Sequence, residues 1–207
     1  MTKDPPQSSV SPIIVRPVIA AGPLWIVASV VVVASGWKLT NPAPTARAIS
    51  ALVGGPRARG GAWMWVARLL GLFEGVLAIA VVLSGGIWAA ALAGLYGAFA
   101  LIALRLRHRS VDCGCFGAAS TRASWIHVEV NAVAAIVAGW SAVVDVPGLR
   151  TATADLPAHG LAHLVLVPTG AAAMIALLTV LPAVRELSRS RPVGDQPVLF
   201  RLRSELT

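Results

Sequence analysis

Charged side chains are scarce in this sequence: they make up 13% of its 207 residues, and only 9 residues are Asp or Glu. Hydrophobic residues, in contrast, make up 57% of the chain. A water-soluble domain of this size has too little interior to bury so much apolar surface. The composition therefore excludes a soluble globular fold and predicts an integral membrane protein.

The shortage of acidic residues leaves a formal net charge of +8, which alone would also fit a nucleic-acid-binding protein. The Lys and Arg residues, however, lie in short clusters between long apolar runs. Membrane topology imposes this distribution on the loops between spans. We therefore expect the lipid bilayer to be a partner of this chain, and we expect no nucleic acid.

Cysteine is almost absent, with only Cys113 and Cys115 in the whole chain. Two cysteines are too few for the disulfide scaffold of a small secreted protein. Their separation by a single residue favours a shared local role over two unrelated packing roles.

Residues 1–15 are polar and contain prolines, with no short apolar region before a small-residue cleavage site, so no cleaved signal peptide is expected.

Five apolar runs are long enough to cross the hydrocarbon core as helices, which takes about 20 residues. They comprise residues 18–37, 65–83, 87–104, 125–144 and 161–183. The predicted fold is an all-α membrane bundle over residues 18–183, with a four-helix core and a fifth C-terminal span. A polar tail (1–17) precedes it and a basic tail (184–207) follows it.

Two connections between the spans have a clear composition. Ser84, Gly85 and Gly86 form the only break between the second and third spans, which predicts a tight turn and an antiparallel helical hairpin. The longer connection over residues 38–64 is rich in proline and glycine, which favour turns at both of its ends. Between these turns, residues 43–53 are compatible with a short amphipathic helix lying at the membrane interface.

The distribution of basic residues predicts the orientation of the bundle. Three of the 17 Lys and Arg residues, namely Lys3, Arg16 and Arg150, fall on one side of a five-span chain, and the other 14 fall on the opposite side. This imbalance predicts a plasma-membrane protein with its N-terminus outside, its C-terminus in the cytoplasm and the cysteine segment at the cytoplasmic face. The fifth span contains Pro168, which neighbouring helices can accommodate.

Glu74 lies about halfway along the second span, where an ionised carboxylate costs about 3 kcal/mol or more. It must therefore be protonated, paired or in contact with water. Ala67, Gly71, Glu74 and Ala78 recur at helical spacing, so Glu74 belongs to a stripe of small residues that faces the bundle. Gly71 and Gly75 form a GxxxG step that lets another helix approach closely. Glu74 either fixes helix packing or takes part in proton or redox chemistry.

His127 and Asn131 are one turn apart at the start of the fourth span. The same helix face continues through Ala134 and Ala138, so both polar side chains are expected to point into the bundle. For His127 two interpretations remain open. It forms a hydrogen bond near the interface, or it relays protons to a thiol.

The cysteines lie in the sequence Asp112-Cys113-Gly114-Cys115 between the third and fourth spans. A disulfide between them needs a tight turn, for which Gly114 supplies the backbone freedom, and such a small ring is strained. Strained, accessible disulfides are labile and suit thiol exchange. The preceding cluster of Arg105, Arg107 and Arg109 favours the reactive thiolate, whereas Asp112 opposes it.

Three interpretations of the cysteine pair are weighed. Thiol-disulfide exchange fits the spacing best. Binding of a soft metal, with His108 or His127 as a further ligand, is less favoured because no full ligand set is visible. The third interpretation treats Cys113 and Cys115 as small, inert packing residues. No metal site is therefore predicted.

Several motifs resemble those of the MauE branch of the MauE/DoxX family of redox-associated membrane proteins. They are Gly36-Trp37-Lys38-Leu39 with Pro42 and Thr45-Ala46-Arg47-Ala48, residues 68–74 in the second span, Cys113-Gly114-Cys115-Phe116-Gly117, and Asn131. The resemblance covers roughly residues 20–140. The Cys-x-Cys-Phe-Gly motif is its most specific part, and residues 161–207 are poorly covered.

The resemblance implies a small helical bundle that supports disulfide formation or maturation of an exported client protein, alongside a thioredoxin-like partner. Cys113 and Cys115 would be the redox pair of a probable thiol-disulfide oxidoreductase, and Glu74 and Asn131 match the polar positions within the bundle. With His127, these five residues form the predicted site.

A cysteine pair at the cytoplasmic face cannot oxidise an exported client directly. Either the pair reaches into the bundle with alternating access, or electrons pass to a quinone, or the orientation is reversed. We favour the first, a carrier of reducing equivalents, because a quinone reaction normally needs a second thiol pair. The rival hypotheses are a non-enzymatic scaffold for a partner oxidoreductase and, third, a small-solute transporter, against which the lack of an inverted repeat argues.

Overall fold

A computed structural model describes residues 12–53, 61–109, 123–150 and 157–189 of the chain. Within these ranges the secondary structure consists of helices, and no strand is present. The helices are α1 (Pro12–Thr40), α2 (Ala43–Val53), α3 (Ala62–Ser84), α4 (Ile87–His108), α5 (Trp125–Val143) and α7 (Pro157–Arg189). The all-α prediction is confirmed.

Four stretches are long and apolar enough to cross a membrane, and they correspond to the first four predicted spans. They are Ala21–Thr40, Ala62–Ser84, Ile87–His108 and Trp125–Val143. The fifth predicted span lies within α7, whose apolar part in the described residues, Val165–Leu181, is shorter. These stretches make the chain a membrane protein built as a helical bundle.

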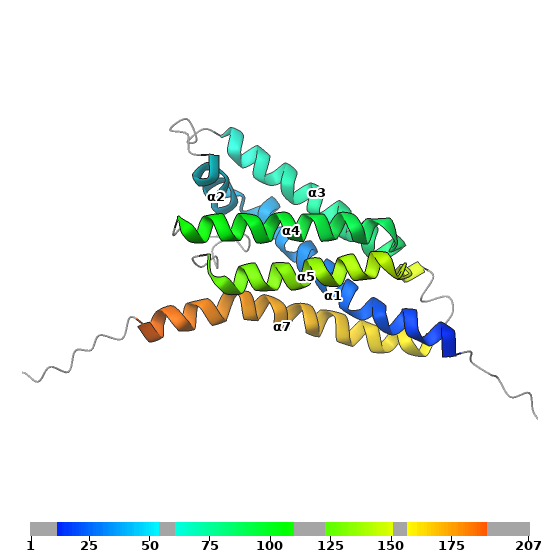
Figure 1. Cartoon of the computed structure of the whole chain (residues 1–207). Coiled ribbons are helices and arrows are strands. Elements are labelled where there is room, and N and C mark those ends of the chain that lie inside the picture. The colour runs from blue at the N-terminus through cyan, green and yellow to red at the C-terminus, as the bar shows by residue number, and fades with distance from the viewer. Residues whose placement is uncertain (1–11, 54–60, 110–122, 151–156, 190–207) are drawn as a thin grey trace, which may run out of the picture.

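The long helices run side by side and alternate in direction along the chain, so that the two described ends lie at opposite ends of the bundle (Figure 1). The helix α1 packs along α3 and α7, while α4 packs along α5. Their shared core contains mostly small and branched residues, with Tyr96 of α4 among them. The Tyr96 hydroxyl donates a hydrogen bond to the Val27 carbonyl oxygen of α1 over 2.7 Å, which joins α4 to α1.

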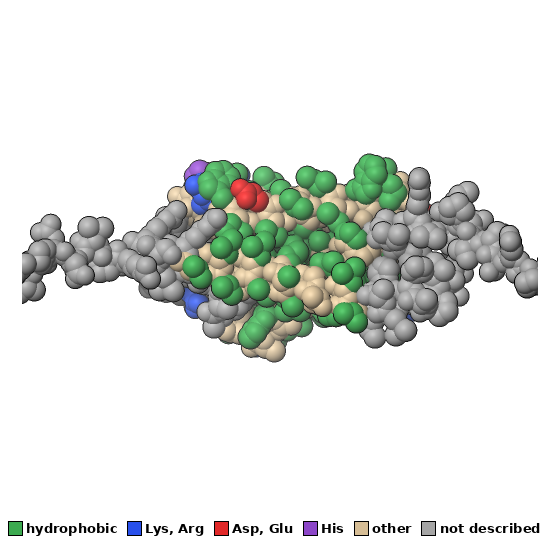
Figure 2. All heavy atoms as spheres, turned by 90° about the horizontal axis from the view of Figure 1, so that it is seen from below, with side chains coloured by type: hydrophobic (Ala, Val, Ile, Leu, Met, Phe, Trp, Pro, Cys, Tyr) green, Lys and Arg blue, Asp and Glu red, His purple; other side chains and the backbone are tan. Residues whose placement is uncertain are grey.

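The outer surface of the bundle is apolar. On α3, five large hydrophobic side chains recur at helical spacing and are each more than half exposed, namely Leu69, Leu72, Phe73, Val76 and Ile79. Figure 2 shows hydrophobic side chains along much of another face, with Lys, Arg and His gathered near one end. Exposed apolar surface of this extent is stable in lipid but not in water.

The predicted hairpin between the second and third spans is confirmed. Gly85 and Gly86 both adopt positive φ, at 64° and 54°. A side chain at Gly85 would collide with the Val146 carbonyl oxygen, and the Gly86 amide donates to the same oxygen over 3.3 Å. Glycine is therefore needed both for the turn and for its close contact with the residues that follow α5.

The opposite end of the bundle, where α1 and α4 end and α3 and α5 begin, is called the basic end here. The helix α2 lies there, and its bounds coincide with the predicted amphipathic segment. Ala48 of α2 packs with Leu106 and Ala123. The Arg109 guanidinium donates hydrogen bonds to the carbonyl oxygens of Ala51 and Leu52, the latter over 3.2 Å, and so satisfies the C-terminal end of α2.

Candidate functional site

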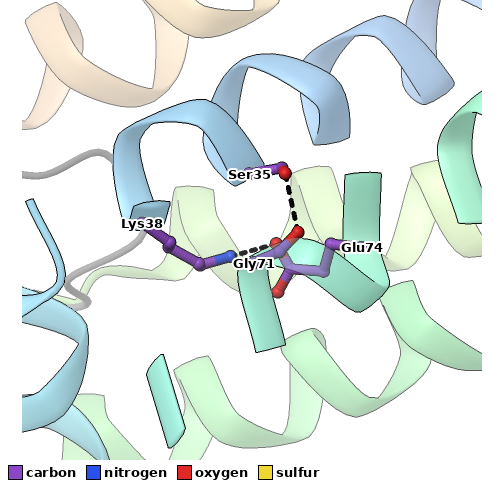
Figure 3. A network of polar contacts seen from close by, with 4 residues as sticks. All are labelled: Ser35, Lys38, Gly71 and Glu74. Carbon is purple, nitrogen blue, oxygen red and sulfur yellow. Dashed lines mark hydrogen bonds and ion pairs between the residues drawn. The ribbon is translucent and has the colours of Figure 1, made fainter. Parts of the chain in front are cut away.

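Glu74 is completely buried in the bundle and forms an ion pair with Lys38 of α1, which is only 3% exposed (Figure 3). The predicted inward orientation of Glu74 is confirmed, and of the three states that the sequence allowed, the paired one is found. A buried charge in a membrane is tolerated when an opposite charge compensates it. The ion pair connects α1 to α3 inside the bundle.

Two glycines of α3 bring α1 close enough for this pairing. A methyl group at Gly71 would lie 2.9 Å from the Lys38 Cβ, and one at Gly75 would lie 2.6 Å from the Ser35 hydroxyl oxygen. The Ser35 hydroxyl donates to the Gly71 carbonyl oxygen over 2.6 Å (Figure 3). The predicted GxxxG step therefore contacts α1, and it seats the Lys38 side chain beside Glu74.

The surroundings of the ion pair are partly aromatic. The Lys38 ammonium group lies 5.1 Å from the centre of the Phe99 ring on α4, within the range of a cation–π interaction. Tyr96 meets Phe99 edge to face, with ring centres 6.4 Å apart. The second carboxylate oxygen of Glu74, Oε1, is buried and has no hydrogen-bond donor among the described residues. Glu74 therefore retains an acceptor that none of the described donors satisfies.

A small cavity lies beside this ion pair and reaches α5. Its volume is about 30 Å³, and its polar lining comes from Lys38, Tyr96, His127 and Asn131, with apolar residues of α1, α4, α5 and α7 around them. Such a space holds about one water molecule when polar groups line it. Lys38 lies two residues before the end of α1 and His127 two residues after the start of α5, so the cavity lies toward the basic end.

His127 is buried, as predicted, with 4% of its surface exposed. Its Nδ1 atom lies 3.3 Å from the Ser124 amide nitrogen and 3.0 Å from the Ser124 hydroxyl oxygen. Because the amide can only donate, Nδ1 accepts and the neutral ring carries its proton on Nε2. Both interpretations of His127 thus remain compatible with its position, since it caps α5 and also lines the cavity.

Asn131 is half-buried and lines the same cavity. Its side-chain amide donates a hydrogen bond to the His127 carbonyl oxygen one turn earlier in α5. This bond fixes the amide group beside His127. Three of the predicted site residues therefore lie around Lys38, namely Glu74, His127 and Asn131. Glu74 does not itself line the cavity but contacts Lys38, which does.

Lys38 is a site residue that the sequence analysis does not predict. The predicted first span ends at Trp37, which leaves Lys38 in the first connection. The helix continues to Thr40, which places Lys38 inside the bundle. The available signal was the need of Glu74 for a cation, since Lys38 is the basic residue nearest to the apolar part of the first span.

Cys113 and Cys115 lie outside the described residues. The segment that carries them connects Arg109 with Ala123, and both of these residues lie at the basic end. The Arg107 guanidinium lies 4.1 Å from the Trp125 ring and links the two helices that flank the segment. The cavity and the ends of the cysteine segment therefore share one end of the bundle.

The described residues around this site do not form a set of metal ligands. In the part of the chain that the structure describes, no group of three or more His, Cys, Asp or Glu side chains could hold a metal ion. The described polar groups around the cavity comprise one ammonium, one phenol, one imidazole and one amide. They suit hydrogen bonding and proton transfer.

Comparisons with known proteins identify one related family. The family model described as methylamine utilisation protein MauE matches residues 16–144, which is more than half of the chain. The match includes Lys38, Glu74, both cysteines, His127 and Asn131, and it ends directly after α5. No curated protein and no solved structure shows significant similarity to the chain.

Proposed function

This chain belongs to the MauE family of membrane proteins, which is linked to methylamine utilisation, and from this premise we propose that it is a membrane thiol-disulfide redox protein. It exchanges electrons with a thioredoxin-like partner through Cys113 and Cys115 and thereby supports disulfide formation in an exported client. The Cys113-Gly114-Cys115 sequence within the matched region carries this proposal, because two thiols at this spacing form a strained, exchangeable disulfide.

The exchange proceeds through a mixed disulfide. A thiolate of the partner attacks one sulfur of the Cys113–Cys115 disulfide, and the other cysteine leaves as a thiolate. The second thiol of the partner then resolves the mixed disulfide. Two electrons and two protons pass from the partner dithiol to Cys113 and Cys115, and the partner becomes a disulfide. The reduced pair is then reoxidised by the disulfide of a second protein on the other side of the membrane, which takes up the two electrons and two protons and becomes a dithiol, so that the chain acts as a carrier of reducing equivalents.

The polar cavity supports a role in handling these protons. Oxidation of a dithiol releases two protons and reduction takes up two, so a nearby group that gains and loses protons assists turnover. His127 and the Lys38–Glu74 pair lie at the cavity or beside it, toward the basic end. We assign proton transfer to His127 and Glu74. We assign to Asn131 a positioning role, because its hydrogen bond to the His127 carbonyl oxygen holds the helix turn that carries His127.

Labelling of the two cysteines with a membrane-impermeant maleimide tests the exchange and the orientation together. Intact and permeabilised cells are labelled with and without prior reduction, and the labelled protein is detected by its mass. We expect a fraction of Cys113 and Cys115 to react only after reduction, because that fraction is a disulfide at rest. With the basic end in the cytoplasm, this labelling also needs permeabilisation.

The other outcomes are equally informative. Labelling in intact cells would reverse the orientation while leaving the exchange in place. Thiols that stay unlabelled under every native condition, yet react after denaturation, would contradict the proposal, because buried thiols cannot exchange with a partner. The matched control is the same protein denatured before labelling, which reports the total thiol content.

A further inference from the structure

A groove on the outside of the bundle has the features of a lipid-binding site. It lies between α2 and α4 and has a volume of about 370 Å³. Its described lining residues are Leu52 of α2, Ala98, Leu101, Ile102 and Arg105 of α4, and Arg109 directly after α4. Its described lining residues are all different from those of the cavity beside Lys38.

The groove changes from apolar to basic along one face of α4. The α4 residues in its wall follow helical spacing, so they form a continuous stripe. From Ala98 to Arg109 the helix rises about 16 Å, which is about half the thickness of the hydrocarbon core. The apolar part therefore lies at the depth of acyl chains, and both arginines lie at the basic end, where lipid headgroups would be.

The two arginines make the mouth of the groove positively charged. Arg105 and Arg109 are both exposed and are one turn apart. None of the described residues that line the groove is acidic. Arg105 has no hydrogen bond or ion pair with any described residue, and Arg109 uses one of its terminal nitrogens for the α2 carbonyl oxygens. Both guanidinium groups therefore keep N–H donors that are not used within the described structure. Guanidinium N–H groups bind phosphate oxygens well.

We propose that this groove binds an anionic glycerophospholipid, with its phosphate on Arg105 and Arg109 and an acyl chain along Leu101 and Ala98. Basic pockets between helices at a membrane surface bind lipid headgroups in this way. The charge of the mouth selects an anionic lipid over a zwitterionic one. The bound lipid would also contact both α2 and α4, at the end of the bundle that carries the cysteine segment.

Lipid retention by the purified full-length protein tests this site. Native mass spectrometry in detergent compares phosphatidylglycerol with phosphatidylcholine of the same acyl chains. We expect the protein to retain phosphatidylglycerol preferentially. Arg105→Gln should lower that affinity roughly fivefold, which corresponds to about 1 kcal/mol for one arginine near a lipid surface, with little change for phosphatidylcholine. Arg105 is chosen because it does not hold α2 in place.

Two further variants complete the test. Arg47→Gln removes an exposed charge from α2 outside the groove and should leave lipid retention unchanged. Ala98→Trp fills the apolar part and should weaken both lipids. Equal retention of the two lipids by the unmodified protein would overturn the proposal. So would an Arg47→Gln effect as large as that of Arg105→Gln, because it would indicate a diffuse surface charge. None of these results depends on the thiol chemistry.

Discussion

Replacing both Cys113 and Cys115 with serine is expected to abolish support of disulfide formation in the exported client while the protein still accumulates in the membrane. Serine keeps the size and polarity of the side chain but cannot form a disulfide, and these are the only cysteines of the chain. The amount of the variant in the membrane, compared with that of the unmodified protein, separates a functional loss from failure to fold.

The readout for this variant is the oxidised fraction of thiols in exported proteins. Thiols are trapped with acid, alkylated and quantified by mass spectrometry in cells that produce the unmodified protein, the double-serine variant or no protein. The variant should match cells without the protein. Ser120→Ala, in the same segment, is the matched control and should behave as the unmodified protein. Full client oxidation with the double-serine variant would favour a non-enzymatic scaffold.

Replacing Lys38 with methionine is expected to destabilise the bundle by about 3–5 kcal/mol, because it leaves a fully buried carboxylate without its cation. Protonation of Glu74 limits the loss, since a neutral carboxyl group is cheaper to bury. Unfolding of the detergent-solubilised protein by heat or denaturant measures the effect. Arg47→Met, which removes an exposed basic residue, should change stability little.

A second substitution shows whether the ion pair itself is responsible. In the double variant Lys38→Met with Glu74→Leu, no unpaired charge remains, and most of the lost stability should return. A Lys38→Met protein as stable as the Arg47→Met protein would show that the pair contributes little. Failure of Glu74→Leu to restore stability would attribute the loss to packing of the Lys38 side chain against Gly71 and Phe99.

Most of the fold could be predicted from the sequence, because the hydrocarbon core of a membrane permits few kinds of backbone structure. Each predicted span corresponds to a helix or to part of one, since an apolar run of about 20 residues has to form its hydrogen bonds internally. Pro42 and the glycines after residue 53 delimited α2, and Gly85 with Gly86 predicted the hairpin. Two helices are longer than the predicted spans: α1 begins at Pro12 and α7 ends at Arg189. The length of an apolar run reflects the thickness of the hydrocarbon core, whereas the helices themselves continue into the interfacial region.

The site was predictable only in part. The inward orientation of Glu74 and His127 followed from the small residues that share their helix faces, and the structure confirms it. The partner of Glu74 did not follow, because pairing depends on how α1 crosses α3 and on the helical turn that extends past Trp37. The cavity arises where four helices meet, and no local pattern encodes such a junction. The roles of Cys113 and Cys115 stay a prediction from their spacing and family.

Trapping of a mixed disulfide tests the central claim most directly. Cys113→Ser and Cys115→Ser are produced singly in cells, thiols are quenched with acid, and the protein is purified without reductant and identified by mass spectrometry. The account predicts that one of these variants carries a covalently attached thioredoxin-like protein, released by reductant and absent from the double-serine variant. If neither single variant forms such an adduct while its remaining thiol is accessible to maleimide, thiol-disulfide exchange is not the function of the pair.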